Sequence, residues 1–98
     1  MATKDGGYGH PVPATKDTQD LCDQVKIRTG KKYQEYKAVK YRREDVSRFV
    51  AGTNYLIKVH VGGEDYIHLI VFGALNGGEV SLTNAKDHQT KDSPLKTF

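Results

Sequence analysis

The spacing of apolar residues changes from a helical period to a period of two along the chain. Apolar side chains recur at helical spacing within residues 16–29, which predicts a helix with one apolar face. Thr15 is a suitable N-cap, and Gly30 is a suitable residue to end the helix. A helix of roughly three to four turns is marginal alone and must pack on another element. Its apolar positions are Leu21, Cys22 and Val25.

Beyond Tyr33 the alternation of apolar and polar residues is typical of strands. It predicts strands over residues 33–41, 55–61, 66–72 and 79–85. Alternate residues of a strand point to opposite faces, so the odd-numbered residues 55–61 should share one face of the sheet. The opposite face should carry Leu56, Lys58 and His60. In the first strand we expect Val39 and Tyr41 on one face and Tyr36 and Ala38 on the other.

Glycine and proline mark the connections and the ends of the chain. Residues 62–65 and 75–78 have the composition of turns. Residues 1–13 are rich in both residue types, which predicts a flexible, extended N-terminal arm that is neither helix nor strand. The polar C-terminal tail ends in Leu95 and Phe98, and we expect these two side chains to pin the tail to the sheet.

One helix followed by consecutive hairpin strands predicts an α+β fold. An antiparallel β-sheet of four to five strands should carry the α-helix across one face. The length of 98 residues fits a single domain over residues 1–98.

Composition points to a soluble protein of the cytoplasm. No apolar run approaches the length that spans a membrane, and the N-terminus has no apolar segment typical of a signal peptide. The one cysteine, Cys22, cannot form an internal disulfide, which is usual in a reducing compartment.

Positive charge is concentrated in one segment. Residues 26–48 hold nine basic and three acidic side chains and carry a net charge of +6, whereas the whole chain carries +3. Such a segment could bind phosphate, as in nucleic acid, or an acidic partner. We favour the alternative of a solvated face, so nucleic acid is not the expected partner.

The residue types that carry catalysis are not grouped in this sequence. The histidines His10, His60, His68 and His88 are dispersed without metal-ligand spacing. Cys22 lies on the apolar face of the helix, as a buried structural thiol does. No pair of glycines has the spacing of a phosphate cradle, and no carboxylate pair has a reason to share a proton. The sequence therefore predicts a protein that is not an enzyme and holds no metal or cofactor.

Three apolar, glycine-containing segments should lie at one end of the sheet. They are the N-terminal arm, the first hairpin turn at residues 48–52 and the later turn at residues 75–78. Together they would form a narrow wedge of nearly bare backbone, which suits a narrow groove such as the substrate cleft of a protease; the alternative is three ordinary turns. The candidate binding residues are Gly6, Gly7, Arg48, Phe49, Val50, Ala51, Gly52, Leu75, Asn76, Gly77 and Gly78.

The stretch VAGTNYLIKVHVG, residues 50–62, resembles the signature of the stefins, the type 1 cystatins. The resemblance covers nearly the whole chain. It extends to DQV at 23–25, KAV at 37–39, HL at 68–69, VF at 71–72 and PLKTF at 94–98.

This resemblance implies a cytosolic, disulfide-free, reversible and tight-binding inhibitor of papain-like cysteine proteases such as the cathepsins. It implies a sheet wrapped around one helix. The family's N-terminal glycine falls on Gly6 or Gly7, its Gln-x-Val-x-Gly loop on residues 48–52, and its second hairpin loop on residues 75–78. Inhibition would occur by filling the cleft on both sides of the catalytic cysteine, without a covalent step, and loop residue Gly52 would lie exposed in the free protein.

The chain departs from the family pattern in the first loop and its approach. Arg48 stands where the family has Gln, Phe49 where a smaller aliphatic residue is usual, and Asn76 where Pro is usual. Residues 42–47 make the approach several residues longer, and the helix is about one turn shorter.

These departures leave alternatives open. One is a stefin-fold protein or engineered scaffold with lost or altered protease binding. Another is a binding module that uses the basic segment. A monomer is expected, with a domain-swapped dimer as the alternative if the first hairpin opens into one long strand.

Overall fold

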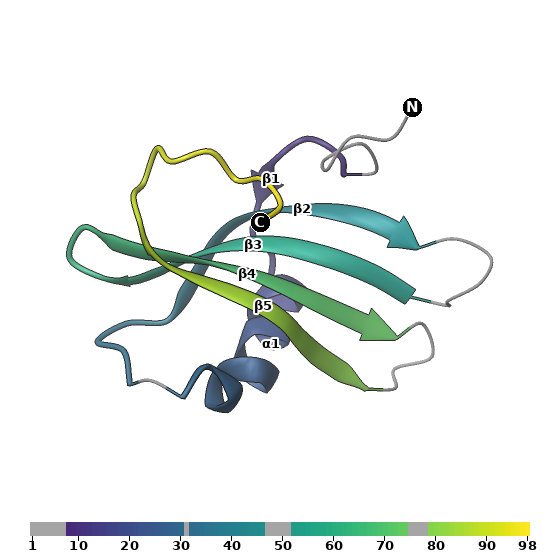
Figure 1. The fold of residues 1–98 in the computed structure, drawn as a ribbon, viewed down its shortest axis with the longest axis horizontal. Coiled ribbons are helices and arrows are strands. Elements are labelled where there is room, and N and C mark those ends of the chain that lie inside the picture. The colour runs from purple at the N-terminus through teal and green to yellow at the C-terminus, as the bar shows by residue number, and fades with distance from the viewer. Residues whose placement is uncertain (1–7, 31, 47–51, 75–78) are drawn as a thin grey trace.

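The computed structural model describes residues 8–30, 32–46, 52–74 and 79–98. Five strands form one antiparallel sheet in the order of the chain, and the helix crosses one face of it (Figure 1). This confirms the predicted α+β fold. The elements are β1 Val12–Pro13, α1 Lys16–Val25, the 3-10 helix η1 Lys26–Thr29, β2 Lys37–Val46, β3 Gly52–Gly62, β4 Asp65–Ala74 and β5 Val80–Gln89.

The predicted helix over residues 16–29 is observed as α1 and η1 in direct succession. Thr15 caps it as predicted: its hydroxyl accepts from the Thr18 backbone N–H at 3.3 Å, while its own N–H donates to the Thr18 hydroxyl at 3.2 Å. Gly30 ends η1 with φ of 71°, a left-handed conformation that favours glycine. Both ends of the helix are therefore encoded locally.

The first long strand begins later than predicted. Tyr33 and Tyr36 precede β2 and stack on each other at 5.6 Å between ring centroids. The Tyr36 hydroxyl donates to the backbone carbonyl of Cys22 at 3.0 Å, so the aromatic alternation that suggested a strand here contacts the helix instead. Gln19 of α1 also bonds the backbone of residues 36 and 38, at 2.9 and 2.7 Å.

A β-bulge at Val39 overturns the predicted faces of this strand. The pairing with β3 shifts between Ala38 and Lys40, so that one extra residue lies in β2. As a result Ala38 and Tyr41 both pack on the core beneath the helix, while Val39 is 39 % exposed. The expectation that Val39 and Tyr41 share a face is therefore wrong.

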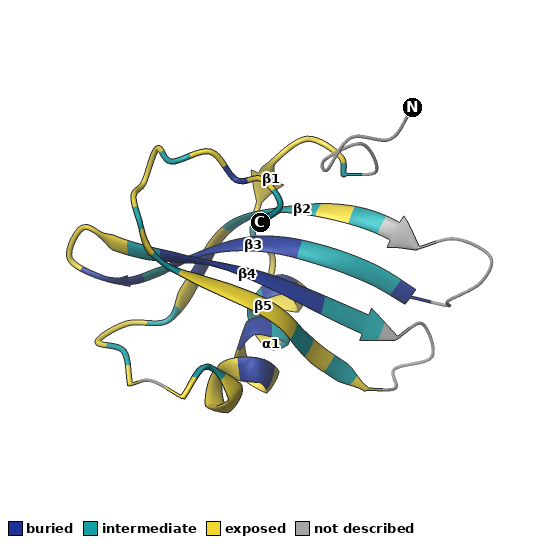
Figure 2. Ribbon diagram, viewed as in Figure 1, coloured by how far each residue is buried: buried dark blue, intermediate teal, exposed yellow. Residues whose placement is uncertain are grey.

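The helix-side face of the sheet carries the main core. Cys22 and Val25 of α1 pack against alternate residues of β3 and β4, and Figure 2 shows these two central strands as the most buried. Burial, with a smaller effect of Asp23, raises the pKa of the Cys22 thiol to about 12. The prediction of a buried structural thiol is confirmed. The strand residues of this core are Ala38, Ile57, Val59, Val61, Ile67, Leu69 and Val71.

The opposite face of the sheet, which we call the tail-side face, is covered by the C-terminal tail. Leu56 and Ile70 form a second, smaller core with Leu95, and Tyr8 and Phe98 pack against it. This confirms both the predicted faces of β3 and the predicted anchoring of the tail by its last apolar residues.

A buried lysine holds the tail in place. Lys58 is fully buried, and its ammonium donates to the carbonyls of Thr90, Lys91 and Ser93 at 2.6, 2.9 and 2.7 Å. Three acceptors match the three donors of the ammonium, which offsets the loss of its water.

His68 makes the stability of this face dependent on pH. It is 1 % exposed, lies between Lys58 of β3 and Lys86 of β5, and its Nε2 has no partner among the described residues. Burial, and then the charges of Lys58, Lys86 and Lys40, lower its pKa from 6.5 to about 4. Between these values the unfolded chain binds more protons than the folded one, so stability is lost as pH falls through this window.

We therefore expect His68→Leu to lose less stability than the wild type between pH 7 and pH 4. The titration of His68 should contribute up to about 3 kcal/mol to the loss in the wild type. Urea unfolding at several pH values measures the difference, with exposed His10→Leu as the control variant. Equal losses in the wild type and His68→Leu would contradict the assignment.

Candidate functional site

Gly52 is the only predicted binding residue inside the part of the chain that the structure describes. The others lie outside the described residues: Gly6, Gly7, Arg48, Phe49, Val50, Ala51, Leu75, Asn76, Gly77 and Gly78. The site is therefore built from the described residues that flank these segments.

The ends of four strands meet at one end of the sheet. Val46, the last residue of β2, pairs with Gly52, the first residue of β3, and Gly52 pairs in turn with Ala74 at the end of β4. Gly73 pairs with Val80, where β5 begins. The residues on either side of 47–51 and of 75–78 thus lie side by side, at the right of the sheet in Figure 1.

The N-terminal arm runs along β2 toward the same end. The short strand β1 pairs antiparallel with β2, Val12 opposite Tyr41, and the Gly9 N–H donates to the Arg43 carbonyl at 3.0 Å. Since Tyr8 packs on the tail-side core, the arm is held to the sheet from this residue onward. The prediction that residues 1–13 contain no strand is wrong at residues 12 and 13, where edge pairing tolerates the proline.

Gly52 is buried as the first residue of β3, so the expectation of an exposed loop residue is wrong. A Cβ placed there would lie 2.5 Å from Cζ of Phe72 and 2.6 Å from the Gly73 carbonyl oxygen. Its φ is outside the left-handed region, so close approach of β4, and not backbone strain, requires glycine here.

The start of β5 is tied to the end of the helix. Arg28 of η1 donates from a guanidinium nitrogen to the Val80 carbonyl at 2.6 Å. Near the first hairpin, the Asn54 amide donates to the Glu44 carboxylate at 3.3 Å. These contacts fix the strands next to the two segments 47–51 and 75–78.

Several cations of the basic segment contact other parts of the protein at its surface. Arg28 and Arg42 donate to backbone carbonyls, and the Lys26 ammonium lies 5.1 Å from the centre of the Tyr36 ring. Lys31 and Arg48, from the same segment, are outside the described residues. The side chains of Lys26 and Arg28 are nevertheless exposed, as are those of Lys32, Lys37 and Arg43, which agrees with the favoured prediction of a solvated face.

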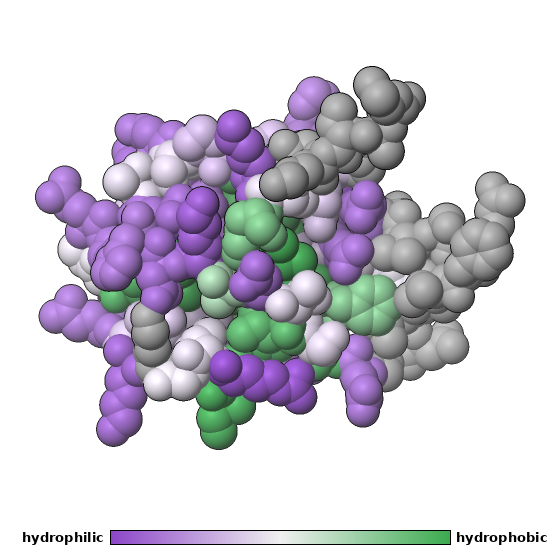
Figure 3. Space-filling model, in the orientation of Figure 1, coloured by the Kyte–Doolittle hydropathy of each residue, from purple (hydrophilic) through white to green (hydrophobic). Residues whose placement is uncertain are grey.

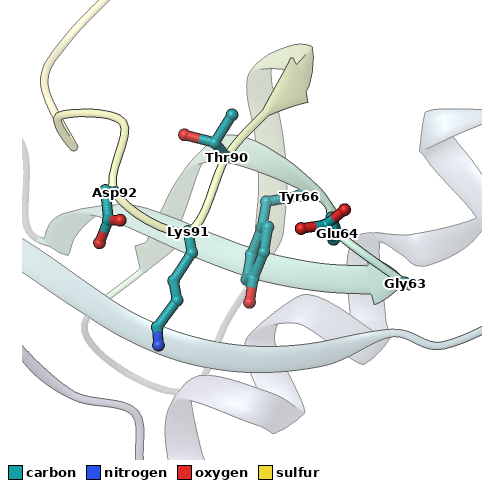
Figure 4. A pocket seen from close by; sticks show the side chains of 6 residues that line it. All are labelled: Gly63, Glu64, Tyr66, Thr90, Lys91 and Asp92. Carbon is teal, nitrogen blue, oxygen red and sulfur yellow. The ribbon is translucent and has the colours of Figure 1, made fainter.

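A pocket of about 450 Å³ lies at the opposite end of the sheet, lined by the β3–β4 turn and by residues that follow β5 (Figure 4). On the face drawn in Figure 3, hydrophilic side chains cover this end, and hydrophobic surface is gathered near the centre. The pocket residues are Gly63, Glu64, Tyr66, Thr90, Lys91 and Asp92.

Among the described residues, no group of three or more His, Cys, Asp or Glu side chains could hold a metal ion. No helix in that part of the chain is long and apolar enough to cross a membrane.

Comparison with known proteins finds similar chains along nearly the full length. A scan against protein-family models gives no match. Leukocyte cysteine proteinase inhibitor 1 of Sus scrofa is 41 % identical over 99 residues, covering 95 % of this chain and 92 % of that protein. Cystatin-B of Oplegnathus fasciatus is 36 % identical over 104 residues and the whole of both chains. Cystatin-B of Homo sapiens is 41 % identical over 92 residues, covering 88 % and 90 %.

The close contact at Gly52 predicts a specific stability defect. Gly52→Ala should lower the free energy of unfolding by roughly 1–3 kcal/mol, because the backbone carbonyl of Gly73 cannot move aside cheaply. Gly73→Ala is the matched control. Its Cβ would meet Tyr55 and Leu21 at ordinary contact distances of 3.6 and 3.7 Å, so its stability should be close to that of the wild type. Thermal melts of both variants test this, and equal stabilities would contradict the packing at Gly52.

Proposed function

The chain belongs to the stefins, the type 1 cystatins, and we propose that it inhibits papain-like cysteine proteases of the cathepsin type. One relative is named a cysteine proteinase inhibitor and others are named cystatins, and the chain is not an enzyme, as the sequence predicts. The observation that carries the proposal is the identity of 41 % to a leukocyte cysteine proteinase inhibitor over 95 % of this chain.

We propose that inhibition is reversible and occurs by occlusion of the protease cleft. Three segments would enter the cleft: the arm at Gly6 and Gly7, residues 48–52 and residues 75–78. The convergence of the flanking strand ends and of the arm supports this, because segments that leave one end of a sheet can contact one groove together. Backbone and small side chains would fill the groove, and no bond of the inhibitor would need to be cut.

We further propose that the protein acts in the cytoplasm as a monomer, with the domain-swapped dimer as the alternative. The buried free thiol of Cys22 supports a reducing compartment. The exchange of a hairpin between two chains would require β2 and β3 to separate at the pairing of Val46 with Gly52.

We expect one equivalent of the protein to abolish the activity of papain titrated for active sites, and to leave trypsin active. The inhibitor offers no reactive group, so dilution should restore papain activity. The interface should be of standard size for protease–inhibitor complexes, on the order of 1,600 Å² in total. Full papain activity in the presence of excess folded protein would refute the proposed function and favour a stefin fold without inhibition.

Removal of residues 1–7 should raise the papain inhibition constant by roughly tenfold or more, equivalent to about 1.4 kcal/mol. It should change the melting temperature little, because the contacts of Tyr8 and Gly9 that tie the arm to the sheet are kept. Removal of residues 1–9 is the control: it also deletes the Tyr8 ring and the Gly9–Arg43 hydrogen bond, so it should lower the melting temperature. An unchanged inhibition constant after removal of residues 1–7 would exclude the arm from the interface.

A further inference from the structure

One arginine of β2 joins the N-terminal arm to the C-terminal tail. The Nε of Arg42 donates to the Gly9 carbonyl at 2.8 Å, and a terminal nitrogen of the same guanidinium donates to the Leu95 carbonyl at 2.7 Å. Hydrogen bonds from a charged donor are shorter and stronger than neutral ones. A planar guanidinium can direct several of them in fixed directions at once. Arg42 therefore holds two distant parts of the chain in one geometry.

The arm makes further contacts at the same place. Gly9 also donates its N–H to the Arg43 carbonyl at 3.0 Å, so both polar groups of its backbone are bonded to β2. The Tyr8 ring lies 5.8 Å from the guanidinium carbon of Arg42 and packs on the core of the tail-side face. The backbone at Tyr8 and Gly9 is thus fixed immediately next in sequence to the segment that carries Gly6 and Gly7.

The tail provides a fixed support for this arrangement. Leu95 is 5 % exposed and packs on Leu56 and Ile70, and the Lys58 ammonium binds three carbonyls within residues 90–93. The Leu95 carbonyl is therefore fixed by the packing of its own side chain and by the Lys58 bonds to the preceding residues. From this fixed position it can orient the guanidinium that contacts Gly9.

We propose that Arg42 is a positioning residue for protease binding, acting through the hydrogen bonds that fix the Gly9 backbone between β2 and the tail. This inference rests on the proposed function of the arm. A segment held in its bound direction before association loses less conformational entropy on binding. Arg42 itself needs no contact with the protease. It belongs to the longer approach at residues 42–47, so this approach has a role in orienting the arm.

A thermodynamic cycle tests the effect on binding. Papain inhibition constants are measured for Arg42→Gln in the full chain and in the chain that lacks residues 1–7. We expect Arg42→Gln to weaken inhibition about tenfold in the full chain and less than twofold in the shortened chain. Lys37→Gln is the matched control, because it removes one charge from an exposed position at the far end of the same strand.

Amide hydrogen exchange tests the positioning without a protease. In Arg42→Gln the Gly9 amide should exchange at least tenfold faster, while the amides of Ile57 and Leu69 in the central strands keep their wild-type protection. Arg42→Lys keeps the charge but lacks the planar fork, so it should restore only part of the protection at Gly9. Arg42→Lys also replaces Arg42→Gln as the test variant if Arg42→Gln folds poorly.

The outcomes separate the two proposals. Faster exchange at Gly9 together with a non-additive cycle supports the role of Arg42. Unchanged exchange, or equal losses with and without residues 1–7, overturns it even if the protein inhibits papain. A wild-type chain that does not inhibit papain overturns the proposed function and the binding role of Arg42 together, whereas Gly9 exchange still decides whether Arg42 fixes the arm.

Discussion

Strand β3 is buried on both faces, and the places of the helix, the tail and the arm depend on this constraint. Its side chains on one face need α1 to exclude water, and those on the other face need the C-terminal tail. The second requirement includes a charge, because Lys58 is buried and its ammonium donates to three carbonyls and one hydroxyl of the tail. The tail is therefore as integral to the fold as the helix. Through Leu95 and Tyr8, the same small core extends to the arm.

Features encoded by local or periodic signals could be predicted from the sequence. The alternation around Ile57, the caps at Thr15 and Gly30, and the anchoring role of Leu95 are of this kind. Features that depend on a distant partner could not. The bulge at Val39 reverses the faces of β2, and the bonds from Gln19 to that strand become visible only when the helix lies across it.

The candidate site shows the same division. The family resemblance identified three candidate binding segments, which include Gly6, Arg48 and Asn76. The antiparallel pairing of the strands explains why the strand ends next to residues 47–51 and 75–78 lie side by side. The sequence could not give the reason for glycine at position 52, because that reason lies in Phe72 and Gly73 of the neighbouring strand. The sequence also did not indicate that residues 42–46 continue strand β2 and pair with β3. Residues 42–46 thus form the second half of a strand of the first hairpin.

The buried thiol of Cys22 has a practical consequence for chemistry on this protein. The chain has one cysteine, and burial keeps its sulfur fully protonated and out of reach of reagents at neutral pH, with a pKa of about 12. A cysteine introduced at an exposed position, such as Lys96 on the tail, would be the faster thiol to react with maleimide by a wide margin. The folded protein can therefore carry a single fluorophore or surface linkage at a chosen point without prior removal of its native thiol.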